Sequence, residues 1–209
     1  MVKIGINGFG RIGRLILRAL LENYKDKIQV VAINDLGSIE TNAHLIKYDS
    51  THGTLNHDVK TSKDGFEISN QKIKVFAEKD PAKIPWGNVG ADVVLECTGI
   101  FLDKSSAQNH IKGGAKKVII SAPAKEVDFT IVQGVNSKEL KKDHNIISNG
   151  SCTTNCLAPV AMVLENNFGI EYGYMTTIHS YTGDQKLLDT LHKDLRRARS
   201  TEGAMIPTS

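Results

Sequence analysis

Cys152 is the residue whose setting most clearly suggests chemistry. It follows Ser151 and opens the run that ends at Cys156, where a hydroxyl-rich turn passes into the apolar stretch 157–164. A thiol at the start of a helix is placed to ionise and to attack a carbonyl carbon. Ser151 and Thr153 add oxygens and backbone donors around the sulfur, which suits an anionic tetrahedral intermediate. The sequence therefore predicts a nucleophilic cysteine.

His179 is the candidate partner of this thiol. We expect a helix over residues 152–168 and a strand over 172–179. If the strand runs back along the helix, it can bring the imidazole close to the sulfur. An imidazole beside a thiol favours the thiolate and can later move the proton of the reacting oxygen. Taken singly, a histidine at a strand end is more often structural, so the pairing depends on the surrounding motif.

The other two cysteines are expected to be core residues. Cys156 lies four residues after Cys152 among apolar neighbours, and free cysteine is usually buried. A redox role for this pair is the alternative. Cys97 lies in an apolar run and is likewise expected in the core. Three cysteines form no recognisable zinc or disulfide framework, so we expect reduced thiols and no metal site.

A glycine-rich turn near the N-terminus is the second candidate site. Gly8, Gly10 and Gly13 lie between an apolar strand and a helix, where glycines let the backbone turn tightly and approach a pyrophosphate. Asp35 ends the next strand, about 20 residues later, where a carboxylate accepts hydrogen bonds from an adenine ribose. A negative group there repels the extra phosphate of NADP, so NAD is the expected cofactor. Small polar groups also end later strands, at Thr98, Gly99 and Ser121.

Strand-length and helix-length segments alternate through the first 150 residues. We expect strands at 2–7, 29–34, 93–96, 118–121, 129–132 and 145–148, and helices at 11–22, 39–48 and 104–112. Short segments at 59–62, 66–68 and 72–77 around turn signals indicate an antiparallel excursion. The pattern predicts an α/β fold with a Rossmann-type, doubly wound, mostly parallel sheet, followed by the start of an α+β domain.

We place the domain boundary at residue 150. Residues 1–150 are expected to form an NAD-binding Rossmann domain, and residues 151–209 an incomplete N-terminal part of a catalytic domain. One helix on one strand cannot bury both apolar faces. Either a partner covers this part, or the chain is a fragment of a longer protein.

Composition narrows the class of protein. The chain is 40% hydrophobic and 23% charged, with a net charge of +3, which suits anionic metabolites but is too small for a nucleic-acid footprint. No apolar run approaches the roughly 20 residues that span a bilayer, and no cleavable signal precedes the first strand. We therefore expect a cytoplasmic protein without nucleic-acid or membrane partners.

Three motifs together carry a family resemblance: Asn-Gly-Phe-Gly-Arg-Ile-Gly-Arg at 7–14, Ser-Cys-Thr-Thr-Asn-Cys at 151–156 and His-Ser-Tyr-Thr at 179–182. Over essentially its whole length, the chain resembles phosphorylating glyceraldehyde-3-phosphate dehydrogenases. The resemblance implies a cytoplasmic, homotetrameric glycolytic enzyme. It would convert glyceraldehyde 3-phosphate, NAD and inorganic phosphate to 1,3-bisphosphoglycerate through a cysteine thioester.

The resemblance also implies roles for single residues. Cys152 is similar to the nucleophile and His179 to the base that activates it. Positions that line the dinucleotide are Arg11, Ile12, Asp35, Lys79, Ser121 and Gly183. Positions that bind substrate and phosphate are Ser151, Thr153, Thr182 and Arg197. By residue type alone, the arginines near 197 would be a solvated basic surface.

Two alternatives remain open from the sequence. Erythrose-4-phosphate dehydrogenase resembles this family in the same motifs, and a truncated chain can persist as a non-catalytic nucleotide- or RNA-binding module. Because the resemblance implies further strands and binding residues after residue 209, we expect the 209-residue chain alone to be inactive or unstable.

Overall fold

The computed structural model describes residues 1–208. The chain folds as two compact units, Met1–Asn167 and Phe168–Ser209. The first contains the sheet and the long helices, and the second is built mainly from turns.

Strands and helices alternate in the first unit, as expected. In chain order they are β1 (Val2–Asn7), α1 (Arg11–Asn23), β2 (Ile28–Asn34), α2 (Ile39–Lys47), β3 (Tyr48–Asp49), β4 (Gly53–Thr54), β5 (Val59–Ser62), β6 (Gly65–Ile68), β7 (Gln71–Phe76), η1 (Pro81–Lys83), β8 (Val93–Glu96), α3 (Lys104–Lys112), β9 (Lys117–Ile120), β10 (Phe129–Thr130), η2 (Ser137–Glu139), β11 (Ile146–Ser148) and α4 (Cys152–Phe168). The helices predicted at 104–112 and 152–168 have the expected bounds, and the predicted strands of this unit shift by at most two residues at either end.

The main sheet is mostly parallel. Its strand order is β10-β11-β9-β8-β1-β2-β7-β6-β5. Strand β1 pairs in parallel with both β2 and β8, while β5, β6 and β7 form the predicted antiparallel excursion. The chain therefore adds β2 and β5 to β7 on one side of β1, and then adds β8 to β11 on the other side. The predicted Rossmann-type α/β fold is confirmed.

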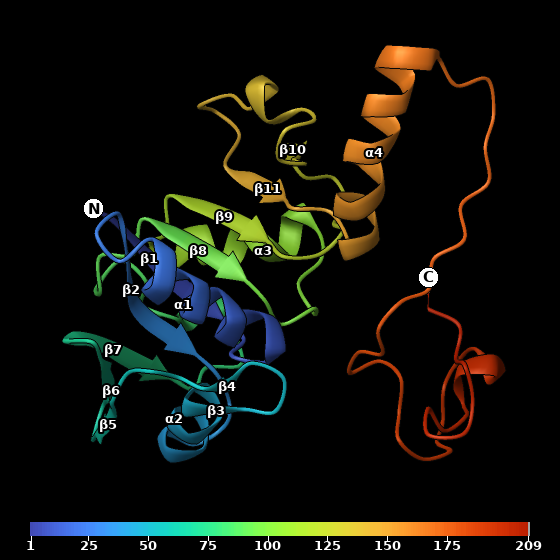
Figure 1. Ribbon diagram of the computed structural model, residues 1–209. Helices are drawn as coiled ribbons and strands as arrows, with labels where there is room; N and C mark the ends of the chain where they lie inside the picture. The colour runs from blue at the N-terminus through green and yellow to red at the C-terminus, as the bar shows by residue number, and fades with distance from the viewer. Residues whose placement is uncertain (209) are drawn as a thin grey trace. The chain divides into compact units, whose positions relative to one another are not determined.

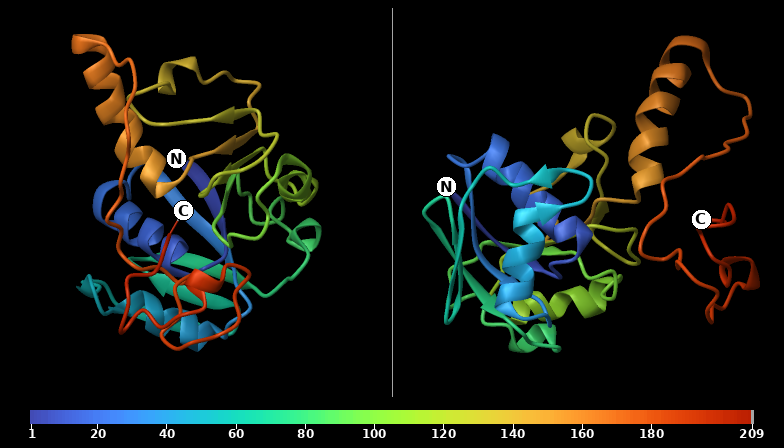
Figure 2. Two further views of the ribbon diagram at one scale, coloured as in Figure 1. Left: turned by 90° about the vertical axis from the view of Figure 1, so that its right-hand side faces the viewer. Right: turned by 60° about the horizontal axis from the view of Figure 1, so that its bottom comes forward.

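Both faces of this sheet are covered. On one face, Leu17 of α1 and Ile46 of α2 pack with Ile6 of β1. On the opposite face, Ala107 of α3 packs with Val118, beside a second cluster around Trp86. Figures 1 and 2 show α1 and α2 on one side of the strands and α3 on the other. Each buried Leu, Ile or Val side chain of these clusters stabilises the unit by about 1.5 to 3 kcal/mol, so the packed layers hold the strand ends in place.

Asp128 connects β11 to α3. Its Oδ2 accepts hydrogen bonds from the backbone N–H groups of Asn145 and Ile146, both at 2.8 Å, and Lys104 Nζ lies 2.7 Å from Oδ1. Partial burial raises the pKa of this carboxyl, but the lysine and the two backbone donors outweigh it and lower the pKa to about 2.

Asp128→Asn is expected to lower the free energy of unfolding by about 2 kcal/mol at pH 7. Because the folded-state pKa is depressed, this stabilisation is present above the ordinary value of 3.8 and is lost as the pH falls through about 2. Urea titrations at several pH values should show the gap between wild type and variant closing below pH 4. A gap independent of pH would contradict this account. Asp143→Asn, at an exposed turn, is the matched control.

Helix α4 differs from the prediction in its burial. Leu157, Val160 and Val163 are exposed, and no residue of the helix is buried. Cys156 is exposed as well, so its predicted place in the core is wrong. Its apolar neighbours form a face that no described residue covers, and an apolar sequence is buried only where another element packs on it.

The strand predicted at 172–179 is also wrong. Residues 172–179 form no strand, and the side chains of Tyr174 and Ile178 are fully exposed. Strand hydrogen bonds require a neighbouring strand, and none is found in the described part of the second unit. This unit is instead held by polar contacts such as those of Thr201 with the Lys186 carbonyl and of Ser200 with Asp189.

Across residues 1–208, none of the helices combines the length and the apolar character that crossing a membrane requires.

Candidate active site

A cavity of about 550 Å³ opens at the carboxyl ends of β1, β2 and β8. It is lined by Asn7, Gly8, Gly10, Asn34, Asp35, Leu36, Glu78, Lys79, Cys97, Thr98, Ile100 and Phe101. Strands β1 and β8 are the neighbours at which the strand order reverses. Doubly wound sheets bind ligands at this point.

The glycine turn forms one wall of the cavity. Gly8 has a φ of +87°, and a Cβ atom there would lie 2.7 Å from the backbone nitrogen of Thr98. Gly10, at the N-cap of α1, has open space where a Cβ would lie and supplies no side-chain cap. The first N–H groups of a helix lack partners within the helix and bind phosphate oxygens. The backbone here therefore fits a dinucleotide pyrophosphate.

Asp35 lies beside this turn. Its Oδ2 accepts a hydrogen bond from the Phe9 N–H at 2.8 Å, and its Oδ1 accepts one from the Gly37 N–H at 2.9 Å. A carboxylate offers about four acceptor positions, so both oxygens keep capacity for ribose hydroxyls. The backbone bonds fix the orientation of the carboxylate, which suits the predicted ribose contact.

The predicted cofactor residues divide into two groups. Those that line the cavity are Gly8, Gly10, Asp35, Lys79 and Thr98. Those outside its lining are Arg11, Ile12, Gly13, Gly99, Ser121 and, in the second unit, Gly183. The Arg11 guanidinium forms an ion pair with Asp49, and the Ser121 hydroxyl is hydrogen-bonded to the Cys97 thiol.

Asn34 and Glu78 line the cavity but were not expected there. The Asn34 side chain bonds both the N–H and the carbonyl of Glu78, at 2.8 and 2.9 Å. One signal could have revealed Asn34: Asn7, Asn34 and Glu96 each occupy the last position of a mostly apolar strand. Glu78 follows β7, which pairs with β2 and so brings this residue beside Asn34.

Ser151 caps the helix that Cys152 begins. Its Oγ accepts a hydrogen bond from the Thr154 N–H at 2.9 Å and lies 2.8 Å from the Thr154 hydroxyl. Such a cap stabilises a helix by about 1 kcal/mol. Cys152 is exposed at the first helical position, where the helix dipole favours an anion. The local structure therefore presents this sulfur at the end of α4 that stabilises a thiolate.

Cys97 has the opposite environment. Burial raises the pKa of its thiol to about 12, despite the hydrogen bond with Ser121. At neutral pH such a thiol is almost entirely protonated, and the thiol form is a poor nucleophile. Although Cys97 borders the cavity, it is therefore unsuited to attack an aldehyde, which leaves Cys152 as the better candidate.

His179, Thr182 and Arg197 lie in the second unit. The Nδ1 atom of His179 lies 2.6 Å from the Ser180 carbonyl oxygen, which can only accept, so Nδ1 carries the proton. Arg197 donates to Asp184 at 2.9 Å, and the Thr182 hydroxyl donates to the Gln185 side chain at 3.0 Å. The predicted catalytic pair is thus divided between the two units, and the pairing of Cys152 with His179 stays a prediction.

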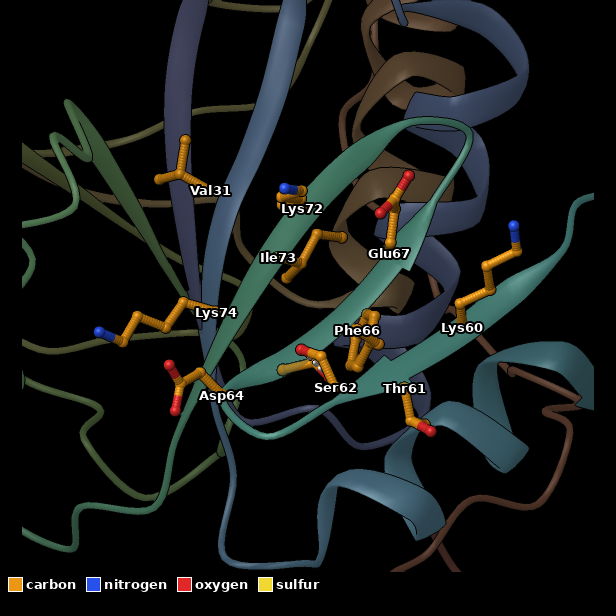
Figure 3. Close-up of a pocket in the computed structure, with 11 residues that line it drawn as sticks. Val31, Lys60, Thr61, Ser62, Asp64, Phe66, Glu67, Lys72, Ile73 and Lys74 are labelled. Atoms are coloured by element: carbon orange, nitrogen blue, oxygen red, sulfur yellow. Dashed lines mark hydrogen bonds between the residues drawn. The ribbon is translucent and has the colours of Figure 1, made fainter.

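A different hollow, of about 460 Å³, lies on the outer strands β5 to β7 (Figure 3). Lys60, Glu67 and Lys72 occupy matching positions on the three strands, so the surface carries charges of both signs. None of the predicted site residues lines it. We regard it as a solvated face of the sheet.

Comparison with known families identifies the chain. Residues 2–104 match the model of the glyceraldehyde 3-phosphate dehydrogenase NAD binding domain, and residues 151–209 match that of the C-terminal domain of the same dehydrogenase. This chain belongs to the glyceraldehyde 3-phosphate dehydrogenase family. NAD is the cofactor that the matched domain names, in agreement with the expectation from Asp35.

Relatives of the same family match the whole chain. It is 55% identical to glyceraldehyde-3-phosphate dehydrogenase of Xanthobacter flavus over 208 residues, and 56% identical to glyceraldehyde-3-phosphate dehydrogenase 1 of Bacillus cereus over 210. The enzyme of Streptomyces coelicolor is 56% identical over 209 residues. The chain spans 62% of the length of each of these relatives. All three relatives carry the name glyceraldehyde-3-phosphate dehydrogenase.

Proposed function

We propose that the protein to which this chain belongs oxidises glyceraldehyde 3-phosphate to 1,3-bisphosphoglycerate, with NAD and inorganic phosphate, through a thioester on Cys152. The observation that carries the proposal is an exposed thiol at the capped N-terminus of α4, in a chain whose first unit holds a cavity beside the glycine turn and Asp35. Membership of the family supports it.

In this mechanism, the Cys152 sulfur attacks the aldehyde carbon after His179 has taken the thiol proton. His179 returns that proton to the carbonyl oxygen, which becomes a hydroxyl, and removes it again as the carbon loses hydride. NAD, when bound, supplies the hydride acceptor. A phosphate oxygen then attacks the thioester carbon, and the Cys152 thiolate leaves. Each cycle consumes one aldehyde, one phosphate and one NAD, releases one acyl phosphate, one NADH and one proton, and regenerates Cys152.

We assign the phosphate groups of the substrates to Ser151, Thr153, Thr182 and Arg197. A guanidinium holds a phosphate with paired N–H donors, and Arg197 keeps its side chain 21% exposed. A phosphate would replace Asp184 as its partner; the Asp184 side chain is 51% exposed, so the loss of this ion pair costs little. Ser151 and Thr153 flank the nucleophile itself.

The remaining assignments concern the whole protein. We propose a cytoplasmic homotetramer without nucleic-acid partners, and a boundary at residue 150 between the NAD-binding and catalytic domains. The second family match, which begins at residue 151, supports that boundary. Arg11, Ile12, Gly13, Gly99, Ser121 and Gly183 remain proposed dinucleotide contacts.

The test uses a protein of family length. We expect a chimera, in which this chain is extended by the C-terminal segment of the Xanthobacter flavus relative, to form NADH from glyceraldehyde 3-phosphate. The steady-state rate should depend on inorganic phosphate, because phosphate releases the acyl group. His179→Asn should lower kcat by about 10² to 10⁴-fold, the usual contribution of a general base. A rate insensitive to phosphate, or equal oxidation of erythrose 4-phosphate, would refute the proposal.

A further inference from the structure

Glu96 is a buried carboxylate that takes no part in the proposed mechanism. It ends β8 with only 1% of its surface exposed. Four hydrogen-bond donors converge on it. Oε2 accepts from Asn7 Nδ2 at 2.6 Å and from His110 Nε2 at 2.9 Å, while Oε1 accepts from the Thr98 N–H at 2.7 Å and from the Thr98 hydroxyl. Both oxygens are thus fully used.

Two of the residues that donate to Glu96 connect it to the cavity. Asn7 and Thr98 both line it. The Asn7 Oδ1 accepts from Asn34 Nδ2 at 2.8 Å, and Asn34 holds the backbone of Glu78 on the far side of the same cavity. Because a carboxylate only accepts, Glu96 forces Asn7 to present its NH2 group, which in turn orients Asn34.

Thr98 contacts both Glu96 and the glycine turn. The backbone nitrogen of Thr98 lies where a Gly8 side chain would be, 2.7 Å from an ideal Cβ, so the two backbones are in direct contact. The Thr98 hydroxyl also accepts from the Ile100 N–H at 3.1 Å and shapes the loop that lines the cavity. A shift at Thr98 would therefore displace the phosphate-binding backbone.

Behind Glu96, a buried pair completes the network. His110 has no exposed surface, and its Nδ1 accepts from the indole N–H of Trp86 at 3.1 Å. An indole N–H can only donate, so the proton of His110 lies on Nε2 and points at Glu96. Both hydrogen bonds of His110 are thus directed toward the Glu96 carboxylate.

From this convergence we infer that Glu96 is the positioning residue of the dinucleotide site, acting through Asn7 and Thr98 and oriented from behind by His110 and Trp86. The inference rests on the proposed function, since it requires that the cavity binds NAD. Glu96 touches no ligand itself. Its effect is to hold two cavity walls, the glycine turn and the loop 98–100, in the geometry that the dinucleotide needs.

The first test is Glu96→Gln in the 209-residue chain, with NAD affinity measured by calorimetry. The new NH2 group faces either Asn7 and His110 or Thr98, all of which donate, so buried donors lose their acceptor. We expect the Kd for NAD to rise about tenfold. Glu67→Gln, on the solvated face of β6, is the matched control and should leave the Kd unchanged (Figure 3).

A pair of variants at His110 separates positioning from folding. The amide nitrogen of glutamine approximates Nε2, so His110→Gln keeps a donor to Glu96 and loses the acceptor for Trp86. Asparagine places an oxygen near Nδ1, so His110→Asn keeps the Trp86 bond and loses the donor to Glu96. We expect the Gln variant to bind NAD within about twofold of wild type and the Asn variant about fivefold more weakly.

The only tryptophan of the chain supplies a second readout. Trp86 fluorescence should change in His110→Gln and stay close to wild type in His110→Asn, the reverse of the effect on affinity. A merely structural role would weaken NAD binding equally in both variants or in neither, and either outcome would overturn the inference. So would wild-type affinity in Glu96→Gln. If the wild-type 209-residue chain fails to bind NAD, this inference is overturned, whereas the proposed function is decided separately by NADH formation in the family-length chimera.

Discussion

Gly10→Ala is expected to raise the Kd for NAD at least tenfold without lowering the stability of the chain. Gly10 has a φ of −70°, which alanine adopts without strain. No protein atom lies within 4 Å of the position that its Cβ would take. The position lines the cavity. A methyl group would therefore occupy space needed by the ligand while touching no protein atom.

Gly13→Ala, in contrast, should lower the stability of the chain. A Cβ there would overlap the carbonyl oxygen of Gly8 and lie 3.1 Å from Ile6 Cγ2, so α1 and the turn must move apart. Overpacking of this kind costs about 1 to 3 kcal/mol, partly offset by the better helix propensity of alanine. Thermal unfolding without ligand should show the loss in Gly13→Ala only.

Calorimetry with NAD completes this comparison. Gly173→Ala, with no atom near its ideal Cβ and in the other unit, is the control for the substitution itself. Wild-type NAD affinity in Gly10→Ala would contradict the assignment of the glycine turn. A loss of stability in Gly10→Ala would contradict the open space that the structure describes.

Much of the first unit could be predicted from the sequence because its signals are local. The strand 93–96 and the helix 104–112 have short apolar or capped patterns that their neighbours in the fold do not override. Asp103, for example, caps α3 by accepting a hydrogen bond from the Ser106 N–H at 2.8 Å. The glycine turn could also be predicted, because its three glycines and Asp35 lie within one βαβ unit.

Two errors have a common physical origin. The segment 172–179 was predicted as a strand and Cys156 as a core residue, both from side-chain type alone. Strand formation and burial depend on an element that packs alongside, and the sequence of a segment does not state whether such a partner is present. Here no described residue covers either segment.

The network around Glu96 could not be predicted because its members are distant in the chain. Asn7, Glu96 and His110 meet only after β1 and β8 pair and α3 packs behind them. A polar residue at a strand end has an ordinary interpretation as a turn residue. Its convergence with two others becomes visible only when the strand register places them side by side.

Cys152→Ser is expected to reduce NADH formation by the family-length chimera at least about 10³-fold. A serine hydroxyl is a much weaker nucleophile than a thiolate and forms an ester in place of the thioester. Cys156→Ser, one helical turn further along α4, should keep the rate within a few-fold, because that thiol has no part in the proposed chemistry. Comparison of the two variants therefore separates the loss of the sulfur at the helix start from the loss of any cysteine in α4.

The decisive measurement is peptide-level mass spectrometry of the chimera after incubation with glyceraldehyde 3-phosphate and NAD, without inorganic phosphate. Because phosphate is needed only to release the acyl group, we expect a 3-phosphoglyceroyl adduct on Cys152, absent from Cys97 and Cys156, that disappears when phosphate is added. An adduct on another residue, or an unmodified Cys152 while NADH is formed, would contradict the thioester mechanism.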